Sequence, residues 1–306
     1  MAKINLKTHI SGIEIKHPVM IGSGVLNDQP NLIERAIIEG EPSAVVTKTI
    51  TWEPREGYQP PIIIELSQGG YLNAVGLANP GRNAIPSLVE VGHRYGVPVI
   101  VSIAGSSLKE FIDLAILAEE YRSIAIELNL SCPHVKGLGA ELGRDPKMVY
   151  TITKDTSSVV KIPILAKLGP WDNVVEISSK ALEGGAKALV LINTIKGMAI
   201  DIYVMKPILS NVIGGLSGPP LHPIAIRIVY EVYRELKPEI IGVGGVVNYE
   251  TAIEFLLAGA KAVQVVSAII KNGFRVVRDI VSGIESYLKF MNLKSIDEII
   301  GAAHKF

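Results

Sequence analysis

Short apolar runs rich in β-branched residues alternate along the chain with longer segments of helical periodicity. The runs have apolar residues on both faces, which is typical of parallel strands covered by helices. Helices are predicted between them at 107–121, 146–160 and 173–183, the last ending at Gly184-Gly185. The predicted strands are 18–22, 44–49, 98–103, 124–131, 163–168, 188–193, 239–243 and 262–267.

Eight strands with interleaved helices in 306 residues predict an α/β fold, a single (β/α)8 TIM barrel domain over residues 1–306. An internal repeat supports this count. The segment 185–193 recurs as 259–267, and each copy is a glycine helix stop followed by a buried strand. A doubly wound open sheet has the same alternation of strands and helices and is the alternative fold.

Three segments interrupt the regular alternation. Residues 4–9 and 13–17, joined through Ser11-Gly12, predict an N-terminal β-hairpin that closes one end of the barrel. The segments 51–82 and 194–222 are insertions after the second and sixth strands. Both follow the carboxyl ends of strands, where such barrels carry their active sites. We therefore expect the two insertions to wall or cover a site.

Composition indicates which classes of binding partner and which cellular compartment to expect. Thirty basic residues balance 30 acidic ones, so the charge favours neither nucleic acid nor an anionic membrane as a partner. Apolar stretches such as 97–104 and 186–192 are too short for a transmembrane helix. The first residues lack the apolar core of a secretion signal, and the single cysteine agrees with a reducing compartment. We expect a cytoplasmic protein.

The single cysteine, Cys132, follows the predicted strand 124–131. One cysteine cannot close an internal disulfide or supply the thiolates of an iron-sulfur cluster. Asn129, Ser131 and His134 place polar groups around it where the apolar run ends. Cys132 is therefore a candidate acid/base at the barrel mouth, and the alternative is a buried cysteine that acts as a small hydrophobic residue.

Other strand ends carry amides and ammonium groups. Lys48 and Lys167 end the second and fifth strands, and Asn129 and Asn193 end the fourth and sixth. Either lysine could lie on the surface, but a buried ammonium needs an anionic or hydrogen-bonding partner, which a bound cofactor would supply. This ring contains no carboxylate. It predicts a site for an electron-rich heterocycle and no metal site.

Glycine-rich turns close the later strands, at 214–218 and 242–245, and Ser267-Ala268 ends the eighth strand. Backbone N–H groups in such turns commonly bind phosphate in these barrels. The pattern Gly242-x-Gly244-x-x-Val247 lacks the last glycine of a dinucleotide fingerprint. We therefore expect a mononucleotide phosphate site and no NAD site.

Five segments, in order along nearly the whole chain, closely resemble class 1 dihydroorotate dehydrogenase. They are Thr-Lys-Thr at 47–49, the loop 72–81, Asn-Leu-Ser-Cys-Pro at 129–133, Ile-Asn-Thr at 192–194, and 214–219. Segments 197–201 and 206–209 look nearest to the class 1B catalytic subunit. The resemblance implies a flavoprotein, a (β/α)8 barrel with FMN at its top. Such an enzyme oxidises (S)-dihydroorotate to orotate in pyrimidine (UMP) biosynthesis.

The same resemblance implies roles for individual residues. Cys132 would be the general base that removes the C5 proton of the substrate while the C6 hydride passes to FMN. Lys167 would stabilise negative charge on the reduced flavin. The residues implied to hold the pyrimidine and its carboxylate are Lys48, Asn73, Gly76, Leu77, Asn129, Asn193 and Thr194. Those implied to hold FMN are Ser23, Lys48, Thr49, Asn129, Lys167, Ile192, Gly218, Gly244, Gly245 and Ser267.

The class 1B resemblance also implies a partner. A dimer of this chain would join a second subunit that carries FAD and a [2Fe-2S] cluster, as a heterotetramer. The 1A-like alternative is a homodimer that passes electrons to a soluble acceptor such as fumarate.

Two positions depart from this family. His134 stands where asparagine is common, and Val266-Ser267-Ala268 replaces a Gly-Thr-Ala turn. Both are similar to the FMN domain of dihydropyrimidine dehydrogenase, which reduces uracil and thymine. The loop 73–81 favours dihydroorotate, because exposed amides around Gly76-Leu77 suit a substrate carboxylate. A non-catalytic phosphate-binding barrel would leave Cys132 and both lysines without a role, and an isomerase or aldolase lacks the expected strand-end carboxylate.

Overall fold

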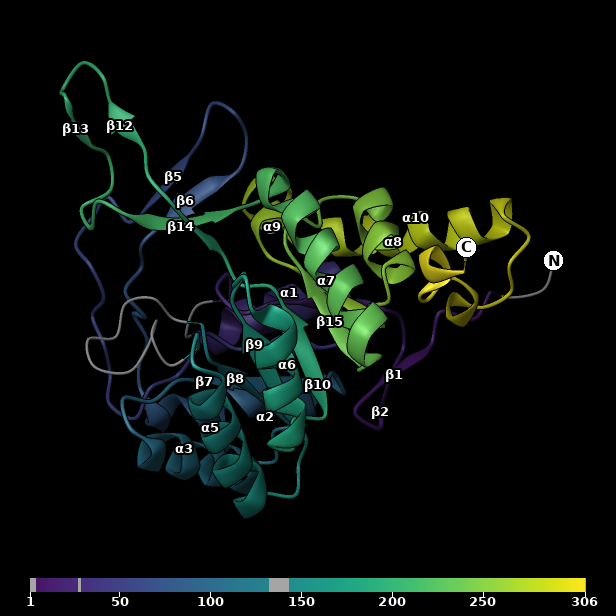
Figure 1. Cartoon of the computed structure of the whole chain (residues 1–306), viewed down its shortest axis with the longest axis horizontal. Coiled ribbons are helices and arrows are strands. Elements are labelled where there is room, and N and C mark those ends of the chain that lie inside the picture. The colour runs from purple at the N-terminus through teal and green to yellow at the C-terminus, as the bar shows by residue number, and fades with distance from the viewer. Residues whose placement is uncertain (1–3, 27–28, 132–142, 306) are drawn as a thin grey trace.

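The computed structural model describes residues 4–26, 29–131 and 143–305, and its centre is a closed barrel of parallel strands (Figure 1). The strands follow one another around the barrel in chain order, which confirms the (β/α)8 barrel over an open sheet. The eight strands are β3 (Val19–Ile21), β4 (Val45–Val46), β7 (Val99–Ile103), β8 (Ala125–Asn129), β9 (Ile164–Leu168), β10 (Ala188–Leu191), β15 (Ile240–Val243) and β16 (Ala262–Val265).

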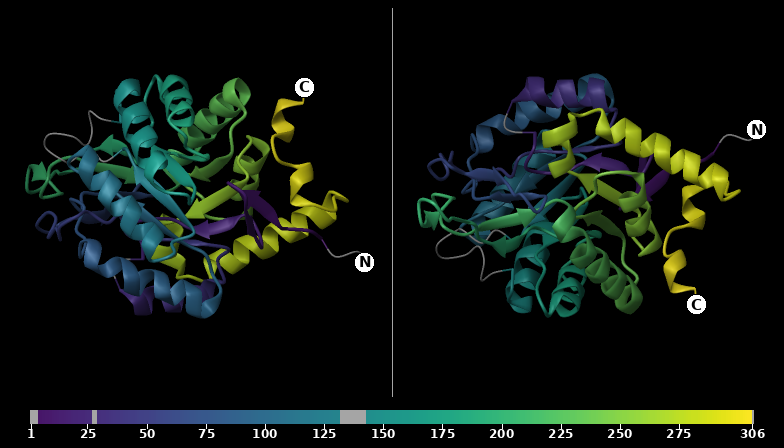
Figure 2. Two further views of the ribbon diagram at one scale, coloured as in Figure 1. Left: turned by 90° about the horizontal axis from the view of Figure 1, so that it is seen from below. Right: turned by 90° about the horizontal axis from the view of Figure 1, so that it is seen from above.

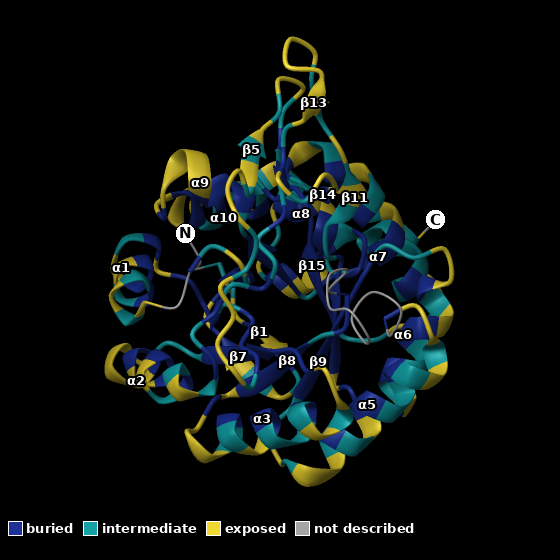
Figure 3. Cartoon of the chain, turned by 90° about the vertical axis from the view of Figure 1, so that its left-hand side faces the viewer, coloured by how far each residue is buried: buried dark blue, intermediate teal, exposed yellow. Residues whose placement is uncertain are grey.

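Helices surround the barrel, with their buried faces toward the strands (Figure 3). The α-helices of the described residues are α1 (Pro30–Gly40), α2 (Ile85–Tyr95), α3 (Leu108–Glu120), α5 (Pro146–Val159), α6 (Val174–Glu183), α7 (His222–Leu236), α8 (Tyr249–Leu257), α9 (Ser267–Asn272) and α10 (Val276–Phe290). Short 3-10 helices are η1 (Arg82–Ala84), η2 (Pro219–Leu221), η3 (Ile296–Glu298) and η4 (Ala302–His304). No described helix is both long and apolar enough to cross a bilayer.

Local sequence signals explain where the helices begin and which face they bury. In α3 the Ser107 hydroxyl accepts a hydrogen bond from the backbone N–H of Glu110, which caps the helix start. Phe111, Leu114 and Ala118 recur at helical spacing and are buried. The three helices predicted from periodicity are confirmed as α3, α5 and α6, and α6 ends at Glu183 with Gly184 as its C-cap, as expected.

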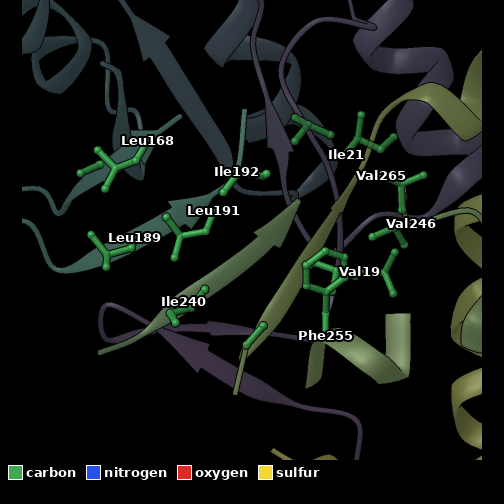
Figure 4. Packing of buried hydrophobic residues seen from close by; sticks show 14 of the residues in the cluster. Val19, Ile21, Leu168, Leu189, Leu191, Ile192, Ile240, Val246, Phe255 and Val265 are labelled. Carbon is green, nitrogen blue, oxygen red and sulfur yellow. The ribbon is translucent and has the colours of Figure 1, made fainter. Parts of the chain in front are cut away.

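Side chains alternate along each strand between the helices and the barrel interior. Val19, Ile21, Leu189, Leu191 and Val265 belong to the outer core beneath the helices (Figure 4). The neighbouring positions form a separate inner cluster, which includes Met20, Val46, Ile100, Leu165, Val190 and Ile241. The barrel is therefore filled by side chains and is not a pore.

The N-terminal hairpin closes the amino end of this barrel. Strands β1 (Thr8–Ile10) and β2 (Ile13–Ile15) are antiparallel, and Ser11 and Gly12 between them both have positive φ, as a two-residue hairpin turn requires. Ile10 and Ile15 join the inner cluster. The hairpin is confirmed but is shorter than predicted, because Asn5 pairs instead with Ser295 near the C-terminal end of the chain.

The two insertions meet in one antiparallel sheet, whose strand order is β11-β14-β6-β5. It lies at the end of the molecule opposite the two termini (Figures 1 and 2). The sequence predicts both insertions but not their pairing, in which Leu216 lies opposite Leu72. The strands are β5 (Ile63–Glu65), β6 (Tyr71–Asn73), β11 (Ile195–Gly197) and β14 (Gly214–Ser217), with a small extra hairpin of β12 (Ile200–Asp201) and β13 (Lys206–Pro207).

Four predicted strands extend two or three residues too far. One of them is the fourth strand, which ends at Asn129. Regular pairing in the second strand stops at Val46, because a bulge follows: Thr47 N–H donates to Ile100 O, and Ile50 N–H donates to Ser102 O. The three-residue step from Thr47 to Ile50 therefore lies opposite a two-residue step from Ile100 to Ser102. As a result, Lys48 and Thr49 leave the regular hydrogen-bond ladder. The sixth strand ends at Leu191. The eighth ends at Val265, because Ser267 begins α9.

His17, which follows β2, provides a pH-dependent contribution to stability. Its ring is 7% exposed, Nδ1 accepts the Val19 N–H, and Nε2 donates to Glu41 O. Burial lowers the pKa of His17 from 6.5 to about 4, with the nearby Lys16 charge acting in the same direction. The fold thus holds a neutral imidazole in one tautomer.

We expect the free energy of unfolding to be highest above pH 6.5 and to fall as the pH drops toward 4. The unfolded chain takes up a proton in that range while the folded one does not. The loss is on the order of 2–4 kcal/mol. Urea unfolding at pH 7 and pH 4.5 checks this. His17→Gln should have a much flatter pH dependence, whereas the exposed control His93→Gln should keep the wild-type slope. Equal slopes in all three proteins would contradict the assignment.

Candidate active site

A pocket of about 400 Å³ lies at the carboxyl end of the barrel. The loops after the barrel strands and both insertions line it. It brings together every residue predicted for cofactor or substrate binding that the structure describes. These are Ser23, Lys48, Thr49, Asn73, Gly76, Leu77, Asn129, Lys167, Ile192, Asn193, Thr194, Gly218, Gly244, Gly245 and Ser267.

Glycine backbone forms one side of this pocket. Gly218, Gly244 and Gly245 have φ angles of 88°, 134° and 69°, which side chains disfavour. A Cβ on Gly245 would lie 2.8 Å from Gly218 O, so the turns after β14 and β15 touch. Ser267 lies beside them after β16. Three turns far apart in the sequence thus expose backbone to one part of the pocket.

Side-chain amides on another side are held in fixed orientations. Asn193 Nδ2 donates to Ser131 Oγ at 2.5 Å and lies 3.4 Å from Asn129 Oδ1. Asn129 Nδ2 donates to Thr49 Oγ1 at 3.1 Å. Since Nδ2 of Asn129 is used in this way, its Oδ1 is left to accept from Asn193 and Ser131. The predicted candidate base, Cys132, lies outside the described residues, as do Pro133 and His134.

No carboxylate is among the described residues that line the pocket, but one lies buried directly behind Lys167. Glu127 is fully buried on β8, and its Oε1 lies 3.4 Å from the Lys167 ammonium, which is itself 5% exposed. Ser102 Oγ donates to Oε1 at 3.1 Å, and Gln264 Nε2 donates to Oε2 at 3.0 Å. Lys167 therefore has its counter-ion within the chain, contrary to the prediction that a bound cofactor supplies it.

Glu127 and Gln264 are the polar groups that the sequence reading missed. Each stands in an apolar strand at an inward position: Glu127 two residues before Asn129, and Gln264 two after Ala262. That two-residue spacing is the signal that could have found them. Gln264 lines the pocket, and its Oε1 has no hydrogen-bond partner among the described residues. Among those residues no group of three or more His, Cys, Asp and Glu side chains is placed to hold a metal ion.

Residues 5–288 match the sequence profile of the family described as dihydroorotate dehydrogenase. The chain belongs to the dihydroorotate dehydrogenase family. This assignment confirms the resemblance drawn from the motifs, and as a member of the family the protein is an oxidoreductase.

Relatives and a solved structure agree with the assignment. The catalytic subunit of dihydroorotate dehydrogenase B (NAD(+)) from Pyrococcus horikoshii is 46% identical over 308 residues, which cover 100% of both chains. A protein from Aeropyrum pernix, provisionally named dihydroorotate dehydrogenase A (fumarate), is 46% identical over 301 residues, 98% of each chain. The crystal structure of DHODH in complex with ferulenol from Eimeria tenella has the same fold, with a TM-score of 0.85, 21% identity, and coverage of 99% of this chain and 89% of that one.

The close packing of these glycine turns leads to a prediction about the free energy of unfolding. Gly245→Ala should cost about 2–4 kcal/mol, because a Cβ would meet His222 at 2.7 Å and Gly218 O at 2.8 Å in addition to the strain of a positive φ. Gly96→Ala is the control, since Gly96 has a similar φ of 63° and nothing within 4 Å of its Cβ. It should cost about 1 kcal/mol. Urea unfolding measures both, and an equal cost would show that the turns can separate freely.

Proposed function

We propose that the protein oxidises (S)-dihydroorotate to orotate in pyrimidine biosynthesis, with Cys132 as general base and FMN as the hydride acceptor. The observation that carries this proposal is the single pocket that gathers all the described residues of the predicted FMN and substrate sites. The names of the relatives, dihydroorotate dehydrogenases of the A and B types, support the same substrate.

The chain's own groups suit FMN. The unpartnered Oε1 of Gln264 needs an N–H or O–H donor, which the flavin ring and the ribityl chain both have. The glycine turns at 218 and 244–245 pack against neighbouring segments too closely for side chains, so they bring bare backbone to the pocket wall, where its N–H groups would suit a phosphate. Lys167 supplies a fixed positive charge in a buried setting. When bound, FMN would supply the hydride-accepting ring that no side chain can provide.

We assign substrate recognition to the part of the pocket lined by side-chain amides. Asn129, Asn193 and Thr194 offer oriented amide and hydroxyl groups for the pyrimidine ring. Asn73 ends β6, opposite Gly215 of β14, so the joined insertion sheet holds it over the pocket. Asn73, Lys48 and the turn at Gly76-Leu77 offer donors for the substrate carboxylate.

Cys132 is assigned the proton step. It directly follows Ser131 in the chain, and the Oγ of Ser131 accepts a hydrogen bond from Asn193, one of the proposed substrate amides. A free thiol has a pKa of about 8.5, so we expect the rate of flavin reduction to rise with pH.

Anaerobic addition of dihydroorotate should bleach the flavin absorption band of the purified protein. Cys132→Ala should keep FMN and orotate binding but slow the bleaching by about 10² or more, as expected for loss of a general base. Cys132→Ser should retain a trace that grows at high pH. Stopped-flow absorbance measures all three proteins, and an unchanged rate in Cys132→Ala would rule out this base.

Substrate choice can be tested on Asn73. Orotate should bind far more tightly than uracil, because uracil leaves buried donors unpaired. Asn73→Ala should weaken orotate by about tenfold or more and uracil little. Asn211→Ala, in the other insertion and outside the pocket, is the control. Titration followed by the flavin spectrum gives the affinities. Equal binding of orotate and uracil by the wild type would favour the pyrimidine reductase activity suggested by His134.

The electrons then need an acceptor beyond this chain. Its one cysteine cannot hold an iron-sulfur cluster, and its sequence lacks a complete dinucleotide fingerprint. Relatives named as catalytic subunits of a B-type, NAD(+) enzyme support a partner subunit with FAD and a [2Fe-2S] cluster, joined to a dimer of this chain.

The isolated chain should therefore reduce an artificial dye with dihydroorotate and form no NADH from NAD. Rapid NADH formation by the chain alone would contradict the partner. Reduction of fumarate would instead place it with the A type named for the Aeropyrum relative. Copurification of a brown iron-sulfur protein from native cells would support the heterotetramer.

A further inference from the structure

We propose that Glu127 is a positioning residue for the reaction: it holds the Lys167 ammonium at the pocket wall and offsets its charge, and it fixes the direction of a hydrogen-bond chain that ends on the substrate amides. The proposal rests on the proposed function, because it assumes that the pocket binds a flavin.

The first observation is the layering of the ion pair. Lys167 lines the pocket, whereas Glu127 is 0% exposed and lies behind it. The ammonium is therefore the only member of the pair that a bound ring could meet. Both carboxylate oxygens of Glu127 accept hydrogen bonds, from Ser102 and Gln264, so the surroundings suit the ionised form. The pair presents positive charge to the pocket while its net charge is zero.

The second observation is a directional chain of hydrogen bonds. A carboxylate only accepts, so Ser102 must donate its hydroxyl proton to Glu127. Ser102 Oγ can then accept from the Thr49 hydroxyl, 3.0 Å away, and Thr49 Oγ1 accepts from Asn129 Nδ2. Asn129 Oδ1 is thereby turned toward Asn193. One buried acceptor thus orients two amides that lie on the substrate side.

The third observation concerns Gln264. Because Glu127 accepts the Gln264 Nε2–H, the amide must present its Oε1 elsewhere, and that buried oxygen has no hydrogen-bond partner among the described residues. The Glu127 carboxylate therefore orients the Gln264 amide so that it offers the pocket its acceptor oxygen and not its donor nitrogen. Three neighbouring groups, Lys167, Asn129 and Gln264, take their charge balance or orientation from a residue that touches no ligand.

The test is the affinity of the bound flavin for sulfite, together with its midpoint potential, from pH 6 to 8. Sulfite adds to the oxidised ring and leaves negative charge there, so it reports positive charge nearby. In Glu127→Gln the Lys167 charge is no longer offset, and sulfite should bind about tenfold or more tightly. A tenfold change corresponds to about 30 mV for a two-electron couple, and the potential should rise by at least that amount.

Variants separate this role from a merely structural one. Lys167→Met should shift both readouts in the opposite direction, and the double variant should return toward the wild type. The control is Glu239→Gln, which removes the same group from another lysine pair, with Lys261, at the amino end of the barrel. It should leave both readouts unchanged.

Wild-type sulfite affinity and potential in Glu127→Gln, with FMN bound, would overturn the proposal even if stability fell. Equal shifts in Glu239→Gln would overturn it as well, because the effect would then not arise at the pocket. Failure of the wild type to bind FMN, or to be reduced by dihydroorotate, would instead sink the proposed function.

Discussion

The buried ion pair between Lys167 and Glu127 organises the polar groups inside the carboxyl end of the barrel. A lone ammonium in this interior would be costly, and so would a lone carboxylate. Each is retained because the other lies 3.4 Å away and because Ser102 and Gln264 satisfy the carboxylate. The apolar inner cluster ends just below this pair, so charge is held at the one end of the barrel that opens into a pocket.

The remaining pocket walls come from segments that the barrel itself does not need. The insertions after the second and sixth strands pair as β6 and β14 and have a small core of their own, formed by Leu72, Ala74 and Leu209. That core supports Asn73 at the pocket, and Leu77 at the far end of the turn packs against Ala104, which follows the barrel strand β7. At the closed end, Ile10 and Ile15 of the hairpin complete the inner cluster, so the barrel opens on one side.

Much of the fold could be predicted from sequence. Parallel strands buried on both faces are uniformly apolar, and the glycines that end the preceding helices are local signals. The strand count, the hairpin and the two insertions all follow from such local signals. Pairing between β6 and β14 could not be predicted, since residues 71–73 and 215–217 are far apart in the chain. The role of Glu127 was not predicted, because a single carboxylate within an apolar strand is not unusual. Only its spacing of two residues from other inward-facing positions shows that it points into the barrel. The bulge at Lys48-Thr49 leaves no sequence mark.

We propose that the polar end of the barrel interior, together with the glycine turns at 218 and 244–245, forms a flavin mononucleotide site. The most direct measurement is titration of the apoprotein with FMN and with riboflavin, followed by quenching of flavin fluorescence. We expect one FMN per chain, with riboflavin bound at least about a hundredfold more weakly because it lacks the phosphate that the turns at 218 and 244–245 would hold. Equal affinities, or no saturable FMN binding, would contradict it.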